Sequence, residues 1–410
     1  MKIAMISQWY DPEVGSAAIP GAIVRALQGR GHEVEVVTGF PNYPTGELYQ
    51  GYRVKPYARE VLRGVKVHRV PLFASHDDSA ARRIVNFLSF MFSASTLGAF
   101  VARRADAVLV YSTPGTVGAA GWVVRRIFGT PFVLYVQDVW PDTVTATGMM
   151  PARLVRPSEW LLHRFCNAVY RAASHIAVIS PGMKDLLVER GVPAGAITVV
   201  HNWIDEDVFH PVARRPRRPE GLEVMYAGNF GDVQGLDTAV RALAKARTSV
   251  DVTLRMIGSG VAEESLRRLA SDLGVSDHVR FEGSRTLAEM AEVLADADVQ
   301  LVCLKDDPLF HLTMPSKIQA ILASGRPLIT SAPGDAARLT DESGAGWSAP
   351  AGDVDALAAL FTRASALSQD ELDDLGERGR RFYESRLGAS VGAAELEKAL
   401  EGAARARRTS

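Results

Sequence analysis

HPVARRPRRPEGLEVMYAG, residues 210–228, decides how this chain is divided. Residues 210–221 are rich in proline and arginine and poor in apolar residues, which is typical of an exposed linker. The following run, residues 222–228, is short, apolar and closed by a glycine, as in a β-strand that ends at a turn. The sequence therefore predicts a linker followed by the first strand of a second domain.

On both sides of this linker, short β-branched runs alternate with stretches of helical spacing. This alternation predicts a mainly parallel sheet covered by helices on both faces, once before the linker and once after it. The predicted fold class is α/β, with two Rossmann-like doubly wound domains whose strand ends face a shared cleft. The predicted strands are residues 2–7, 32–38, 65–71, 105–112, 131–138, 175–180 and 197–202, then 222–228, 252–258, 279–283, 299–304 and 326–330.

The composition is that of a globular protein, because 47% of the 410 residues are hydrophobic and 23% are charged. Cys166 and Cys303 have no metal-binding or redox spacing, so we expect two core residues and a reducing cytoplasm. Residues 1–200 hold 21 Lys and Arg against 14 Asp and Glu. This excess predicts an anionic partner such as a membrane surface, although ordinary variation between domains explains it equally well.

Two stretches of the first half are candidates for a membrane surface. Residues 84–101 carry no charge and are flanked by Arg82, Arg83, Arg103 and Arg104. We favour a buried or interfacial helix over a membrane-spanning one, because an asparagine and three serines interrupt the apolar run. Residues 152–173 combine apolar and basic residues in the same way, and a helix packed within the domain is the alternative.

Small or polar residues follow several predicted strands. Gly15 and Ser16 open a helix after the first strand, where backbone N–H groups can approach a phosphate or sugar. Asp138 ends a buried strand and is a candidate to orient or deprotonate an acceptor hydroxyl, with a helix N-cap as the alternative. In the second half, Asn229 and Gln234 are candidate phosphate donors, while Gly258, Ser284 and Arg285 lie at further strand ends. Several such strand ends on one rim predict a nucleotide site.

MPSKIQAILASG, residues 314–325, predicts a turn and a short helix. Pro315 and Ser316 suit the first positions of this helix, and Gly325 suits the residue just past its end. Lys317 lies in the first turn, where the helix dipole disfavours a cation, and no acidic residue lies between Pro308 and Gly334. We therefore expect an anionic ligand at this helix start.

The chain resembles the GT-B-fold retaining glycosyltransferases of family 4, and within them the bacterial polysaccharide branch of the L-fucosamine transferases. The motifs that carry the resemblance are YDPEVGSAA, GHEVEVVTGFPNYPTG, YVQDVWPD, VISPGMKDLL, VVHNWIDEDVF, YAGNFGDVQGLD, FEG, MPSKIQAILASGRP and GAGW. It implies an acceptor-side domain over residues 1–205, a nucleotide-sugar domain over residues 206–385, and a C-terminal helix, 386–410, that crosses back.

The resemblance also implies roles for individual residues. Lys317 and Asp138 would be the catalytic residues, with Glu13, Asn42 and Tyr43 on the acceptor side. The donor would be bound by Gly15, Ser16, Asn229, Gln234, Gly258, Ser284, Arg285, Met314, Pro315, Ser316 and Gln319. No metal and no cofactor are implied, because such enzymes stabilise the leaving diphosphate with helix N-termini and basic side chains.

The chain departs from the wider family at three places. The positions of its Glu-x7-Glu motif hold about Leu312 and Ala320, so Gln319 is a candidate ribose contact in this branch. Asn229 and Gln234 replace basic residues, and Pro20 stands where close relatives would carry arginine.

The expected reaction is transfer, with retention, of an N-acetylhexosamine or deoxy-aminohexose from a UDP-sugar to a lipid-linked saccharide or another hydroxyl acceptor. The alternative is a UDP-N-acetylhexosamine 2-epimerase of the same fold. The expected location is the cytoplasm, with the inner membrane surface as a further partner and no nucleic acid.

Overall fold

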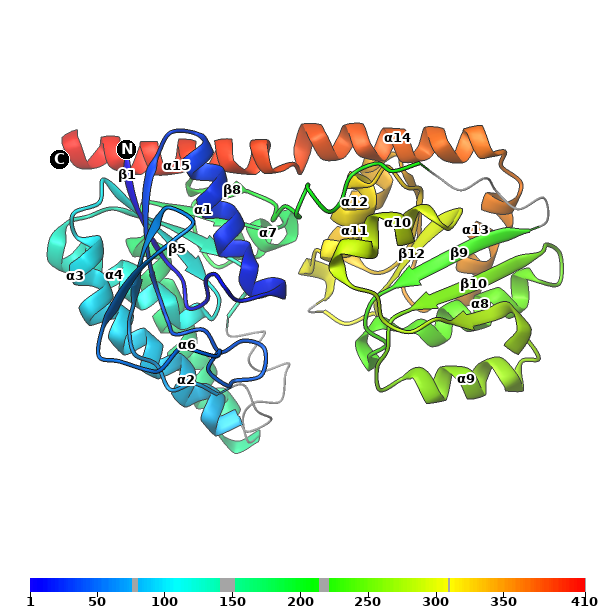
Figure 1. Cartoon of the computed structure of the whole chain (residues 1–410), viewed down its shortest axis with the longest axis horizontal. Helices are drawn as coiled ribbons and strands as arrows, with labels where there is room; N and C mark the ends of the chain where they lie inside the picture. Colours follow the sequence, from blue (N-terminus) through cyan, green and yellow to red (C-terminus); the bar gives the residue numbers. More distant parts are fainter. Residues whose placement is uncertain (76–79, 141–151, 214–220, 309, 410) are drawn as a thin grey trace. The chain divides into compact units, whose positions relative to one another are not determined.

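The computed structural model describes residues 1–75, 80–140, 152–213, 221–308 and 310–409. The chain divides into two compact units (Figure 1). The N-terminal unit comprises Met1–Asn202 and Gly392–Ser410, and the C-terminal unit comprises Trp203–Val391. The boundary between the units falls between Asn202 and Trp203, ahead of the linker predicted at residues 210–221, and residues 214–220 of that linker lie outside the described part of the chain.

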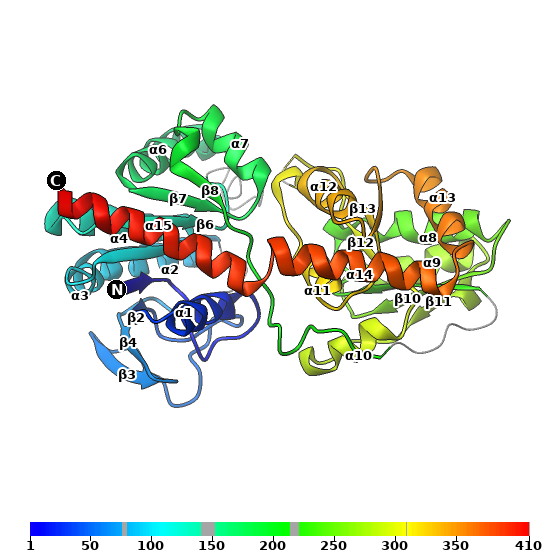
Figure 2. The same cartoon turned by 90° about the horizontal axis from the view of Figure 1, so that it is seen from above.

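The N-terminal unit is built on an eight-stranded sheet in the order β3-β4-β2-β1-β5-β6-β7-β8. Each predicted strand of this half is present, and the pairs are parallel except for β3, which runs antiparallel to β4 at one edge (Figure 2). The sequence prediction missed β3, whose side chains are half-buried or exposed because it has a neighbour on one side only. The strands are β1 (Lys2–Ile6), β2 (Glu33–Thr38), β3 (Ala58–Leu62), β4 (Val65–Arg69), β5 (Ala107–Ser112), β6 (Phe132–Val136), β7 (His175–Val178) and β8 (Ile197–Val199).

Helices cover both faces of this sheet, with α1 and α15 on one face and α2, α4 and α6 on the other (Figure 1). Glu397 of α15 accepts hydrogen bonds from Arg30 and His32 beside α1, which fixes the C-terminal helix on the N-terminal unit. The helical segments are η1 (Gly15–Ala18), α1 (Ile19–Gly29), α2 (Ala80–Ser93), η2 (Ala94–Gly98), α3 (Ala99–Ala102), η3 (Gly115–Val117), α4 (Gly118–Phe128), α6 (Ala152–Ala172), α7 (Pro181–Glu189), η4 (Ala194–Ala196) and α15 (Ala389–Thr409).

The C-terminal unit contains a six-stranded parallel sheet in the order β11-β10-β9-β12-β13-β14. Its five predicted strands are present, and β14 is an additional short edge strand. The prediction missed β14 because its four residues, GWSA, carry no β-branched run. The strands are β9 (Leu222–Ala227), β10 (Val252–Ile257), β11 (Val279–Phe281), β12 (Val299–Cys303), β13 (Leu328–Ser331) and β14 (Gly346–Ala349).

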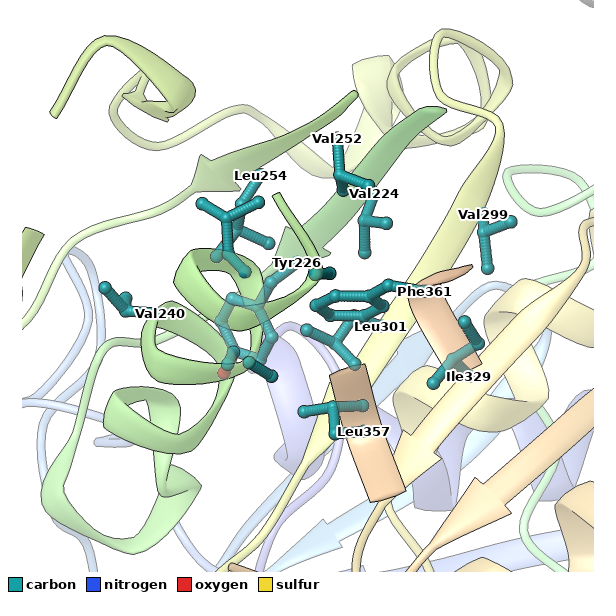
Figure 3. Close-up of a cluster of buried hydrophobic side chains, with 14 of the residues drawn as sticks. Val224, Tyr226, Val240, Val252, Leu254, Val299, Leu301, Ile329, Leu357 and Phe361 are labelled. Atoms are coloured by element: carbon teal, nitrogen blue, oxygen red, sulfur yellow. The ribbon is translucent and has the colours of Figure 1, made fainter. Parts of the chain in front are cut away.

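The core of the C-terminal unit forms where β9, β12 and β13 meet the helices that cover them. Val224, Leu301 and Ile329 point from neighbouring strands toward Leu357 and Phe361 of α13 (Figure 3). Central strands buried on both faces explain their nearly continuous apolar sequence. The helical segments are η5 (Asp232–Gln234), α8 (Leu236–Ala246), α9 (Glu263–Asp272), η6 (Ser276–His278), η7 (Leu287–Glu289), α10 (Met290–Ala295), η8 (Phe310–Leu312), α11 (Ser316–Ala323), α12 (Gly334–Ser343), α13 (Val354–Ser365) and α14 (Gln369–Arg386).

Two predictions about buried and apolar segments can be compared with this fold. Cys166 and Cys303 form no disulfide and are buried, as expected of core residues. Within the described residues, Ala81–Ala102 is long and apolar enough to cross a membrane by length and composition, but one third of its most apolar window is buried in the unit. The helix is continuous through α2, η2 and α3.

Candidate functional site

Lys317 is the centre of the candidate site. It is the second residue of α11, and Pro315 occupies the N-cap position without a side-chain hydrogen bond to the helix. The ammonium group of Lys317 donates a hydrogen bond to the hydroxyl of Tyr226 on β9, and its Nζ lies 4.0 Å from the centre of that ring. Tyr226 in turn donates to the backbone carbonyl of Asn229 at 2.8 Å. The lysine is thus held against the turn that follows β9.

The charge of Lys317 has no carboxylate partner among the residues that the structure describes. Burial lowers its pKa to about 8, because an ammonium ion loses hydration in the interior. The neighbouring thiol of Cys303 supplies no negative charge near neutral pH, because burial raises the pKa of Cys303 to about 12. A half-buried cation without a counter-ion, beside the N–H groups of a helix start, is suited to an anionic ligand.

Glycines allow the loops around Lys317 to approach one another closely. Gly228 has φ +147°, and a Cβ atom added there would lie 2.2 Å from Nζ of Lys317. A Cβ on Gly258 would lie 1.9 Å from the carbonyl oxygen of Gly228, and one on Gly260 would lie 2.4 Å from that of Phe230. These positions require glycine, and Gly228 leaves the space that the lysine head occupies.

The other donor residues predicted after β9 and β11 lie at strand ends of this unit but are already engaged with their own loops. The Gln234 side-chain oxygen accepts from the N–H of Gly231 at 3.0 Å and caps η5. The hydroxyls of Ser284 and Ser259 lie 3.2 Å apart, which brings the ends of β10 and β11 together. Arg285 folds back and donates to the Glu282 carbonyl at 2.8 Å. Ser284, Arg285 and Asn229 are exposed and remain accessible to a ligand.

The start of α11 differs in part from the prediction. Ser316 is exposed, while Met314 and Pro315 are half-buried, so these three residues flank Lys317 as expected. Gln319 is only 2% exposed, so its side chain offers a ribose almost no surface. Ala320, at a position where the wider family carries glutamate, lines a pocket of about 200 Å³. Its other lining residues are Ile204, Phe209, Ala227, Leu287, Met290, Leu294, Gln300, Leu301, Ser316, Lys317 and Ile321.

In the N-terminal unit, Asp138 lies two residues beyond the last residue of β6. The Thr113 hydroxyl donates to Oδ2 of Asp138 at 3.3 Å, and burial raises the pKa of this carboxyl. A half-buried carboxyl with one neutral hydrogen-bond donor and a raised pKa is suited to exchange a proton or to orient a hydroxyl. Asp142, an alternative helix cap, lies outside the described residues.

Glu13 has a different role from the acceptor contact that the sequence predicted. Its side chain is 3% exposed, and its two oxygens accept from the backbone N–H groups of Tyr10, Asn42 and Tyr43 at 2.8–3.0 Å. Asn42 is also buried and donates to the carbonyl of Phe40. Glu13 therefore fixes the loop after β2 against the loop after β1, and neither Glu13 nor Asn42 presents a free polar group to an acceptor.

The rest of the predicted N-terminal rim is arranged around this buried carboxylate. Gly15 has φ +66° and begins η1, and a Cβ added there would lie 4.0 Å from the ring of Tyr43. Ser16 belongs to η1, although its side chain lies outside what is described. Tyr43 is half-buried and its ring lies 5.4 Å from that of Trp9. Gly15 and Tyr43 are therefore neighbours.

Sequence reasoning missed Tyr226, although it holds the predicted lysine. In the sequence, Tyr226 is one residue of a predicted apolar strand. Its hydroxyl meets Lys317 because the fold places α11 beside β9. The glycine two residues later was the available signal, because a glycine at a strand end marks a close approach of another group.

Comparison with known proteins shows which families the two units resemble. Residues 14–203 match the family model described as a glycosyl transferase 4-like domain, and residues 221–366 match the one described as glycosyl transferases group 1. The protein is a GT-B glycosyltransferase. The two matches fall on the two α/β units, one on each.

Among the relatives of this glycosyltransferase are two bacterial proteins named as glycosyltransferases. It is 28% identical over 295 residues to the probable glycosyltransferase WbjE of Pseudomonas aeruginosa, covering 70% of this chain and 72% of that protein. It is 25% identical over 344 residues to WcaI of Escherichia coli, a putative colanic acid biosynthesis glycosyl transferase, covering 81% and 83%. The Anabaena Alr3699/HepE structure, solved with UDP, superposes with a TM-score of 0.67 at 14% identity, covering 98% of this chain and all of that one.

These findings bear on the alternatives raised by the sequence. The relatives are transferases, so the epimerase alternative receives no support. The general family resemblance is confirmed, whereas the finer likeness to L-fucosamine transferases is not.

Proposed function

We propose that this glycosyltransferase moves an N-acetylhexosamine or deoxy-aminohexose from a UDP-sugar to a lipid-linked saccharide or another hydroxyl acceptor, with retention, as the L-fucosamine transferases do. The observation that carries the proposal is Lys317, a half-buried cation without a carboxylate partner at the start of α11. UDP in the Alr3699/HepE structure and the polysaccharide relatives support the choice of donor and acceptor class.

In this proposal, residues 206–385 bind the donor, residues 1–205 bind the acceptor, and the helix 386–410 crosses back to the first domain. Lys317 and the N–H groups of α11 stabilise the charge that develops on the leaving diphosphate. The same diphosphate contacts Met314, Pro315 and Ser316. Gly15 and Ser16 are further donor-binding residues of this proposal. Asn229, Gln234, Gly258, Ser284 and Arg285 form the remaining donor rim.

Asp138 orients the acceptor hydroxyl, and its raised pKa allows it to receive the proton when the donor phosphate does not. No metal ion takes part in this scheme, because the lysine and the helix start supply the positive charge that the diphosphate needs. The lipid-linked acceptor places the enzyme in the cytoplasm and at the inner face of the cell membrane, where the basic N-terminal half would face anionic lipid.

The test of this function is product formation from a panel of UDP-, GDP- and TDP-sugars with a short-chain diphosphate-linked saccharide as acceptor. We expect UDP release that depends strictly on the acceptor, persists in excess EDTA, and yields a product with the donor's anomeric configuration by proton NMR. Release of UDP without acceptor, an inverted product, or full loss of activity in EDTA would contradict the proposal.

The pH dependence of UDP affinity provides a separate check on Lys317. UDP favours the protonated lysine, whose pKa in the free protein is about 8, so we expect the Kd for UDP to rise about tenfold between pH 7 and pH 9. Without UDP, raising the pH has the opposite consequence, because it stabilises the folded protein. The unfolded chain binds more protons above pH 8, so this group makes the folded state more stable as the pH rises towards 10.5.

Calorimetric titration of UDP at pH 7, 8 and 9 measures the effect. Lys317→Met is the control, because it retains the length of the side chain without the titrating group, and its affinity should be independent of pH. An equal pH dependence in both proteins would exclude Lys317 as its source.

A further inference from the structure

Three helical segments on one face of the N-terminal sheet form a surface that the proposed reaction does not use. They are the continuous helix α2–η2–α3, followed along the sheet by α4 and then α6 (Figure 1). The middle helix, α4, packs against η2 and α3 on one side and against α6 on the other. We call their outward side the three-helix face.

Large apolar side chains are exposed along the three-helix face. Phe92 is 70% exposed, Ile127 67% and Trp160 63%, although all three belong to helices that pack against the sheet or against one another. The spacing of Val85, Leu88 and Phe92 places them on one side of the helix. The full set is Val85, Leu88 and Phe92 on the first helix, Trp122 and Ile127 on α4, and Trp160 and Leu161 on α6. Leu97 and Phe100 are also exposed, at the rim of a hollow that residues of β1, β2 and β4 line as well.

The three helical segments carry far more positive than negative charge in their sequence. Residues 80–104, 118–128 and 152–172 contain ten arginines and one acidic residue, Glu159. Two of the arginines lie over exposed aromatic rings, with the guanidinium of Arg103 3.5 Å from the Phe100 ring centre and that of Arg164 5.0 Å from the Trp160 ring centre. Aromatic residues with arginines at their edge match the boundary between lipid tails and anionic headgroups.

The first helix lies on the sheet and is held there. The Asn86 side chain accepts from Gln8 and donates to the Phe73 carbonyl, both at 2.6 Å. Gly98 lies so close to β2 that an added Cβ would be 2.8 Å from Val37. Phe90 and Ala94 are fully buried on the same side. Because one side of this helix is fixed to the domain in this way, only its other side, which carries the exposed apolar residues, is available to an external surface.

We propose that the three-helix face docks on an anionic phospholipid bilayer, with the helices parallel to the membrane plane. The exposed aromatic and aliphatic side chains enter the headgroup region, and the arginines bind lipid phosphates. This deepens the proposed function, because it identifies the surface through which the enzyme reaches a lipid-linked acceptor.

The test is flotation of the full chain with vesicles of phosphatidylcholine alone or of phosphatidylcholine mixed with phosphatidylglycerol, which is anionic. We expect binding to the anionic vesicles only, weakened by salt because exposed charges are screened. Phe92→Ser combined with Trp160→Ser should lower the partition coefficient about tenfold or more, since two exposed aromatic rings no longer enter the lipid. Arg126→Glu should also lower it.

The matched control is Val261→Ser combined with Leu273→Ser, which removes exposed apolar side chains from the C-terminal unit. It should bind vesicles as the unaltered chain does. Equal binding of the Phe92/Trp160 variant would overturn the proposal, and so would binding that resists alkaline extraction, which would indicate a spanning helix. If the unaltered chain sediments as a dimer and the Phe92/Trp160 variant sediments as a monomer, the three-helix face would instead be an interface between two copies of the chain.

The vesicle-binding result and the test of the proposed sugar transfer can fail independently of each other. Flotation needs no substrate, and the Phe92/Trp160 variant should keep its turnover with the short-chain, water-soluble acceptor. Loss of vesicle binding with unchanged turnover of the soluble acceptor supports the surface. A chain that floats normally but transfers no sugar would refute the reaction and leave the surface intact.

Discussion

Replacing Lys317 by alanine is expected to lower kcat by about 10²- to 10³-fold, the range seen when one preorganised stabilising group is removed from a transition state. The physical reason is the position of this cation, half-buried beside the N–H groups of α11 and without a carboxylate that would neutralise it. Its charge is therefore available to a leaving diphosphate. Initial rates of UDP release at saturating donor and acceptor measure the loss.

Folding should be almost unaffected by this substitution. Burial disfavours the charged form of Lys317, which is why its pKa is lowered, so removing the charge relieves that penalty while a small void forms. The unfolding midpoint should therefore stay within a few degrees of the original value. Lys245→Ala is the control, because Lys245 is exposed on α8 and paired with Asp355, and it should retain full turnover. Turnover of the Lys317 variant within about threefold of the unaltered enzyme would remove Lys317 from the mechanism.

Replacing Gly228 by alanine should reduce both stability and UDP affinity. The residue has φ +147°, a conformation that costs other residues about 1–3 kcal/mol, and the new Cβ would meet Nζ and Cε of Lys317 at 2.2 and 2.4 Å. The lysine must then leave its position on Tyr226. We expect UDP affinity to fall at least tenfold, measured by calorimetry, together with a lower unfolding midpoint.

A control and a double variant separate the two effects. Gly274→Ala also places alanine at a positive φ, +67°, but with no atom within 4 Å, so it should lower stability without lowering UDP affinity. In the Lys317→Ala background, Gly228→Ala should have little further effect on UDP affinity, because the group it displaces is already absent. Additive losses would show that Gly228 acts on the nucleotide independently of the lysine.

Much of the fold could be predicted from the sequence because its central strands are buried on both faces. Such strands appear as uninterrupted apolar runs, and those of both units were recognised on that basis. The edge strands β3 and β14 were not, because a strand with a partner on one side has fewer buried positions and a weaker pattern. Pairing of β3 with β4 also depends on a hairpin at Arg63 and Gly64, which carries no extended signal.

The sequence predicts the candidate site only at Lys317, a residue that departs from the usual charge preference of a helix start. A cation in the first turn of a helix, far from any acidic residue in sequence, marked Lys317. Glu13 was assigned to the acceptor because its environment was unknown. The backbone N–H groups that bind its carboxylate have no sequence signature, so their presence at Tyr10, Asn42 and Tyr43 became visible only in the fold.

The sequence by itself therefore determined the two α/β domains and the unusual lysine, because periodicity and helix-end preferences act over short distances. The tertiary structure decided what surrounds that lysine. Tyr226 and Lys317 are 91 residues apart, and they meet because parallel strands deliver their carboxyl ends to one edge of the sheet. The three-helix face was also decided there, since only packing shows which side of an apolar helix is left exposed.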